Sequence, residues 1–136
     1  MLVADIHHVS INVTDTARAL QFYNGVLGLA LLPRPDFSFG GAWLDAGNGR
    51  QIHLIENEVP PNLGQHVAFR VDDVDAVVAA LRASGVEVSD AKAVGDTAIR
   101  QAFTISKASS ASAFKSAQFR RNLEGAARLS DRISQY

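Results

Sequence analysis

The chain lacks cysteine altogether, which excludes disulfide bonds, thiolate metal sites, iron–sulfur clusters and a cysteine nucleophile. It also has no apolar run approaching the roughly 18 residues that cross a membrane. Its charges nearly cancel, since 13 Lys and Arg face 14 Asp and Glu, so no strong positive field attracts nucleic acid or an anionic membrane. The opening residues, MLVADIHH, contain no basic segment typical of a signal peptide. We therefore expect a cytoplasmic protein with no nucleic-acid or membrane partner.

What the chain does contain is an internal repeat. Residues 8–15 read HVSINVTD and residues 66–73 read HVAFRVDD, so a His, two Val and an Asp recur at a constant offset of 58. A helical pattern and then a glycine follow each copy. Alternating strands resemble one another by chance, but the repeated His and Asp favour duplication of a half-domain. With 136 residues, of which 47% are apolar, residues 1–136 are expected to form a single domain.

Both halves show the same predicted order of elements, β-α-β-β-β. Asp15 or Thr16 is suited to cap the first helix, and Gly28 to end it. The acidic residues after Val71 are suited to the N-terminus of the second helix. In the first half, strands are expected over residues 5–13, 29–33, 40–45 and 51–56, with a helix over 16–26. In the second half, strands are expected over 65–71, 86–89 and 98–105, with a helix over 73–84 and a loop over 91–96.

Histidines lead a polar row on three of these strands. Because side chains alternate along a strand, each His shares a face with residues two and four positions away. The opposite faces are mostly apolar and are expected to pack on the helices. The predicted polar rows are His8 with Ser10 and Asn12, His66 with Ala68 and Arg70, and His53 with Gln51 and Ile55.

These imidazoles are candidate metal ligands. Neutral imidazole binds Zn, Ni, Co, Fe and Mn, and the absence of cysteine excludes softer sites. His7 lies on the opposite face from His8 and is left out of the set. A single His at a strand end is more often a hydrogen-bonded surface or core residue than a ligand, so that alternative stays open for each of them.

The residues around the repeat resemble the vicinal oxygen chelate superfamily, which includes glyoxalase I, the fosfomycin and bleomycin resistance proteins and the extradiol dioxygenases. The resemblance begins in the run IHHVSINVTDTARALQFYNGVLGLALL, which carries His8, Val13 and Asp15, then Phe-Tyr on a helix, then Leu-Gly. The run GQHVAFRVDDVDAVVAALRASGVEV is similar to the opening of the family's second module. The resemblance extends from residue 4 to about residue 104.

The resemblance implies an α+β fold in which two βαβββ modules form a curled, cup-like sheet around a metal. Residues 4–58 would be the first module and residues 64–105 an incomplete second one. The ligands in such proteins come from the first and last strands of each module, which implies His8, His53 and His66 here. The fourth ligand is usually a Glu on the last strand, where it is also the general base.

The resemblance stops after residue 104, in a divergent tail over residues 106–136. No Asn-Gly turn or Glu-bearing strand is recognisable there. Residues 106–113 are interpreted as a linker, and the apolar spacing over residues 114–135 predicts a helix that replaces the last strand. Two explanations fit this change: a natural replacement by an amphipathic helix, or a coding change such as a frameshift.

The leading hypothesis is a small metal-dependent enzyme of the glyoxalase and resistance-protein type: a lyase, isomerase or small-molecule transferase. A divalent metal (Zn, Ni, Mn, Fe or Co) would act as Lewis acid on an oxygen-rich small substrate. The alternative is a non-catalytic protein of the same fold that binds a small molecule or drug, and a third is an inert relic. No catalytic residue is assigned. The candidate substrate-binding residues are Ser10, Asn12, Arg70 and Trp43. A homodimer is expected, because such modules often complete their sites by pairing between chains.

Overall fold

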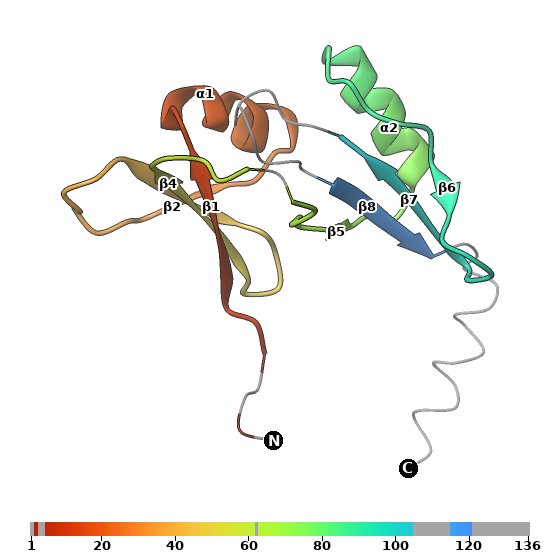
Figure 1. Ribbon diagram of the computed structural model, residues 1–136, viewed down its shortest axis with the longest axis horizontal. Helices are drawn as coiled ribbons and strands as arrows, with labels where there is room; N and C mark the ends of the chain where they lie inside the picture. Colours follow the sequence, from red (N-terminus) through yellow and green to blue (C-terminus); the bar gives the residue numbers. More distant parts are fainter. Residues whose placement is uncertain (1, 3–4, 62, 105–114, 121–136) are drawn as a thin grey trace.

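The chain folds as two small sheets, each with a helix on one side. The computed structural model describes residues 2, 5–61, 63–104 and 115–120, the last range by its backbone path. Figure 1 shows the two helical segments on the same side of the molecule, with the sheets beneath them. Among the described residues, no helix is both long and apolar enough to cross a membrane.

The two modules have the same topology. In each, the first strand pairs in parallel with the last strand, which also pairs antiparallel with the strand before it. The strand orders are β1-β4-β3-β2 and β5-β8-β7-β6. This arrangement confirms the predicted α+β fold of two βαβββ modules. The first module comprises β1 (His8–Val13), α1 (Thr16–Leu20), the π-helical segment η1 (Gln21–Val26), β2 (Leu31–Leu32), β3 (Gly41–Asp45) and β4 (Gln51–Glu56). The second comprises β5 (Phe69–Arg70), α2 (Val74–Ala83), β6 (Lys92–Ala93), β7 (Ile99–Phe103) and β8 (Lys115–Arg120).

The repeated Asp explains why a helix follows each first strand. Asp15 is the N-cap of α1 and accepts a hydrogen bond from the Arg18 amide at 2.9 Å. Asp73, its counterpart 58 residues later, caps α2 and accepts from the Ala76 amide at 3.0 Å. Each carboxylate satisfies an amide that the first helical turn leaves without a partner. The repeat therefore encodes a strand end and a helix start together.

The core of the first module lies between its sheet and its helical segment. Val13, Leu44 and Leu54 on the inner face of the sheet are essentially inaccessible to solvent. Phe22 and Tyr23 from η1 pack against them in the same cluster. This packing confirms that the apolar rows of β1 and β4 face the helix, which leaves the His row on the other side.

Several predicted elements differ from the observed ones. The helix over 16–26 changes to π-helical geometry after Leu20, with the Leu27 amide bonded to the Phe22 carbonyl five residues earlier. The strand predicted over 86–89 is reduced to a single bridge between Val88 and Thr104. The loop predicted over 91–96 contains β6, which pairs with β7. Short pairings of this kind depend on a neighbouring strand and have no local sequence signal.

The helix predicted over residues 114–135 is wrong where the structure describes it. Residues 115–120 form β8, which lies between β5 and β7 and completes the second sheet. The physical reason is that β5 and β7 present backbone groups that only a strand can pair, and this tertiary pairing outweighs a local helical pattern. The last strand is therefore present, and the second module extends to Arg120. Residues 106–113 of the expected linker and the rest of the predicted helix lie outside the described residues.

Gly41 provides a test of the close contact between β3 and β4. A Cβ atom on Gly41 would lie 2.2 Å from the Leu54 carbonyl oxygen, so Gly41→Ala must push the two strands apart. We expect it to lower the free energy of unfolding by about 1–3 kcal/mol, the usual cost of overpacking. Gly25→Ala is the control, because its Cβ would meet nothing closer than 3.9 Å. Urea unfolding of both variants checks this; equal destabilisation would contradict it.

Tyr23 should make stability sensitive to alkaline pH. Burial raises the pKa of its hydroxyl to about 12, above the ordinary value of 10. The unfolded chain therefore loses this proton first, and the free energy of unfolding should fall between pH 10 and 12 by up to about 1.4 kcal/mol per pH unit. Below pH 10 the effect should be absent. Comparing the wild type with Tyr23→Phe isolates it, since the phenylalanine variant should have a flatter profile over that range.

Candidate functional site

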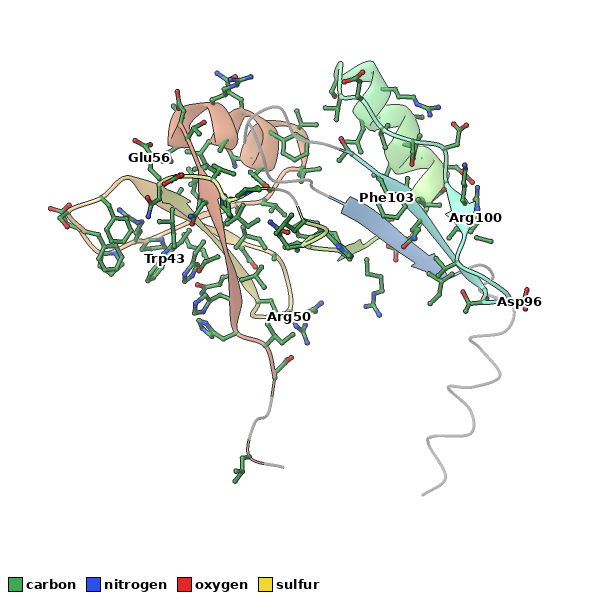
Figure 2. The ribbon with its side chains drawn as sticks, in the orientation of Figure 1. Trp43, Arg50, Glu56, Asp96, Arg100 and Phe103 are labelled. Carbon is green, nitrogen blue, oxygen red and sulfur yellow. The ribbon has the colours of Figure 1, made fainter. Side chains whose placement is uncertain are left out.

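The candidate site lies on the face of the first sheet opposite α1. Strand register places Ser10 and Trp43 on either side of His53, as its direct partners on β1 and β3. His8 lies two residues from Ser10 and so shares this face. Figure 2 shows Trp43 on the side of the sheet away from α1, and Glu56 close to the start of that helix. The predicted common face for His8 and His53 is therefore confirmed by the register.

His53 is the central ring of an aromatic stack. The Trp43 and His53 ring centroids are 4.3 Å apart with planes 8° from parallel, and those of His53 and His8 are 4.1 Å apart at 13°. His7, expected on the opposite face, instead lies just before β1 and contacts His8 edge-on, with ring centroids 5.2 Å apart and the two Nδ1 atoms 3.0 Å apart. His53 is only 8% exposed, whereas His8 is exposed to solvent. The sequence pattern predicted the shared face but not this stacking.

The surroundings of His53 favour its neutral form. Burial lowers the pKa of its imidazole, and the neighbouring His8 and His7 lower it further. Its Nε2 atom lies 2.7 Å from the Gln51 side-chain oxygen, which accepts a hydrogen bond. Nε2 therefore carries the proton and Nδ1 keeps its lone pair. A neutral imidazole with a defined tautomer is the form that binds a metal ion.

The four candidate substrate-binding residues have different environments. Ser10 is exposed beside His53, and Trp43 covers the other side of that ring. The Asn12 side-chain amide donates to the Glu58 carbonyl at 2.7 Å, so it holds the segment that follows β4. Arg70 lines a cavity of about 510 Å³ between the modules, together with His8. Ser10 and Arg70 are thus exposed and Trp43 is half-buried, while Asn12 makes a structural contact.

His66 does not join the other two imidazoles within one chain. It precedes β5 instead of lying in a strand, and its Nδ1 donates to the Gly64 carbonyl at 2.9 Å. That hydrogen bond leaves Nε2 with a lone pair, as in metal-bound histidines. Within the described residues, no group of three or more His, Cys, Asp or Glu side chains is placed to hold a metal ion.

The donor chemistry of His8 and His53 fits a divalent ion, but their ring orientation must change to share one. An imidazole binds a metal through a lone pair in its own plane, and two rings stacked face to face have no common in-plane position. His8 is exposed and has room to rotate. The strand that supplies a Glu in similar proteins, β8, reads Lys-Ser-Ala-Gln-Phe-Arg and has no carboxylate.

Each module pairs its first strand with its last, and a His lies at the start of β1 and shortly before β5. This arrangement matches a known family. The chain belongs to the glyoxalase/bleomycin resistance protein/dioxygenase superfamily. The family model matches residues 5–104. This finding confirms the resemblance seen in the sequence and accounts for all of the chain up to the divergent tail.

Two curated relatives each match part of the chain. Lactoylglutathione lyase of Haemophilus influenzae is 33% identical over 97 residues, covering 62% of this chain and 70% of the lyase. Glyoxylase I 4 of Arabidopsis thaliana is 28% identical over 95 residues, covering 62% of this chain and 54% of the relative. The chain thus spans about half the length of the latter.

Solved structures show the same fold over nearly their whole length. A glyoxalase family protein from Enterococcus faecalis has a TM-score of 0.71 at 21% identity, covering 89% of this chain and 100% of the other. TnmS3, an antibiotic-binding protein from Streptomyces, has a TM-score of 0.67 at 25% identity, covering 88% and 97%. The fosfomycin resistance protein FosX of Listeria monocytogenes, complexed with Mn(II), has a TM-score of 0.70 at 15% identity, covering 93% and 99%.

The stacked position of His53 predicts a large loss of stability on truncation. His53→Ala removes a buried ring from between Trp43 and His8 and should lower the free energy of unfolding by about 2–3 kcal/mol. His7→Ala, at an exposed position, should change it by less than about 0.5 kcal/mol. Urea unfolding followed by the emission of Trp43, the only tryptophan, measures both. A His53→Ala protein as stable as His7→Ala would show that burial of the His53 ring between Trp43 and His8 contributes nothing.

Proposed function

We propose that this protein is a small metal-dependent enzyme of the glyoxalase and resistance-protein type. Its metal ligands are His8, His53 and His66. The observation that carries the proposal is the buried, neutral His53 beside His8 on one sheet face, with its tautomer set by Gln51. A buried imidazole held in this way is the usual preparation of a metal ligand.

The third ligand comes from a second copy of the chain. His66 has its Nε2 atom available, yet the described part of one chain contains no three-ligand group. Pairing two copies so that His66 of one approaches His8 and His53 of the other supplies three imidazoles per site. The homodimer is thus part of the proposal.

The chain's own residues bind and orient the substrate. When bound, a divalent ion supplies Lewis-acid polarisation of substrate oxygens. Arg70 is exposed and lines the same cavity as His8, where it offers a positive charge to an anionic substrate group. Trp43 covers one face of His53 and keeps water from it. Because β8 has no carboxylate, we assign no general base.

A second candidate is a metal-free binding protein of the same fold. It is favoured by the missing carboxylate on β8 and by the face-to-face stacking of His8 and His53. The similarity to the antibiotic-binding TnmS3 supports it as well. We call the sheet face that carries His8, Ser10, Trp43 and His53 the His face. In this case its exposed part would bind the small molecule directly.

Metal analysis separates the two candidates. Protein purified without chelator or affinity-tag metal should contain one divalent ion per chain by mass spectrometry. His8→Ala and His66→Ala should weaken metal binding by more than the roughly 10–100-fold that loss of an outer-shell partner costs. Both positions are exposed, so the variants should fold normally. Lys92→Ala, an exposed substitution on β6 of the other sheet, is the control and should keep its metal.

Light scattering on the same samples tests the dimer. The expected mass is twice the 14.6 kDa of one chain at micromolar concentration. A metal-free wild type that still binds small molecules would favour the second candidate. A monomer with bound metal would leave His66 without its proposed role.

A further inference from the structure

An unusual aromatic surface lies beside the His face. Phe37 and Phe39 are 40% and 45% exposed although both are large apolar side chains. Their rings are nearly parallel, 9° apart, with centroids separated by 5.2 Å. Both belong to the segment between β2 and β3. We call Phe37 and Phe39 the aromatic platform.

The platform is held in place by its own loop. Pro33 and Pro35 restrict the backbone before it. Arg34 donates from Nη2 to the Phe39 carbonyl at 2.8 Å. The guanidinium carbon of Arg34 also lies 4.7 Å from the Phe37 ring centre and 5.2 Å from that of Phe39. Each contact opposes collapse of the rings, so the exposed surface is already formed before any ligand arrives.

Ring contacts connect the platform to the site. Phe37 lies 6.2 Å from Trp43, tilted by 51°, and Trp43 stacks on His53 at 4.3 Å. Phe37 is therefore two ring contacts from the imidazole that the proposed function uses. Phe37 and Phe39 stack on each other, and a preformed aromatic pair beside polar groups favours ligands with a π-face.

We infer that the ligand of this site carries a planar aromatic ring, which extends the stack of Phe37 and Phe39 while its oxygen-bearing arm reaches the sheet face that carries His8 and His53. The inference rests on the proposed function only in that the same molecule meets His53. Phe37 and Phe39 then determine specificity, and Arg34 is a positioning residue that holds them.

Two matched probes test the inference. Benzoate and cyclohexanecarboxylate have the same charge and similar size, but only benzoate has a π-face. Benzoate should bind about 2- to 12-fold more tightly, the range expected for an aromatic pair beyond its buried area. Titration followed by Trp43 emission and by calorimetry measures both affinities. Equal affinity for the two probes would overturn the inference.

Variants test whether the preference for benzoate depends on the aromatic platform. Phe37→Leu combined with Phe39→Leu should bring the affinity ratio to about one, while Phe103→Leu, on β7 of the other sheet, should keep it. Metal content is measured on each sample, since loss of the ratio with metal retained supports the platform independently of the proposed metal site. The inference would be overturned if the double variant kept the affinity ratio. It would also be overturned if that variant alone changed from dimer to monomer, because the platform would then be an interface between copies.

Discussion

The parallel pairing of β1 with β4 is the constraint on which the rest of the site depends. It sets Ser10 opposite His53. Side chains alternate along each strand, so this register places each alternating set of β1 on the same sheet face as one set of β4. The face toward the helical segment receives Val13 and Leu54 and becomes the core. The other receives His8 and His53. A slip of one residue would bury the imidazoles and expose the core, so packing and site geometry are determined together.

Much of this arrangement could be predicted from the sequence, because it depends on local patterns. The repeated His and Asp located both modules, and Asp15 and Asp73 cap the helices as their positions suggest. The strand over residues 51–56 was predicted at its observed limits. What failed depends on distant partners. The helix expected from residue 114 is a strand over 115–120, because apolar spacing says nothing about the open edges of β5 and β7.

In the candidate site too, features set by local patterns could be predicted, whereas features that depend on distant partners could not. Alternation along β1 and β4 predicts that His8 and His53 share a face, and the register confirms it. The position of His53 between Trp43 and His8 depends on how three strands align. The sequence of one segment does not contain that information. The position of His66 is harder still. Its strand is shorter than its alternation suggests, and in one chain it lies apart from the other imidazoles. The role of His66 would depend on how copies of the chain assemble.

The joining of first and last strands in each module has a consequence for how the protein is made. A ribosome releases the chain from its N-terminus, and β1 must wait for β4, more than 40 residues later, before its backbone groups find partners. Once residue 56 has emerged, the first module has every strand it needs. The second must wait until residue 120, and until then β5 and β7 both lack the strand that joins them. The first module can thus act as a finished surface on which the second assembles, and the interval before β8 arrives is when the nascent chain is most exposed to mispairing.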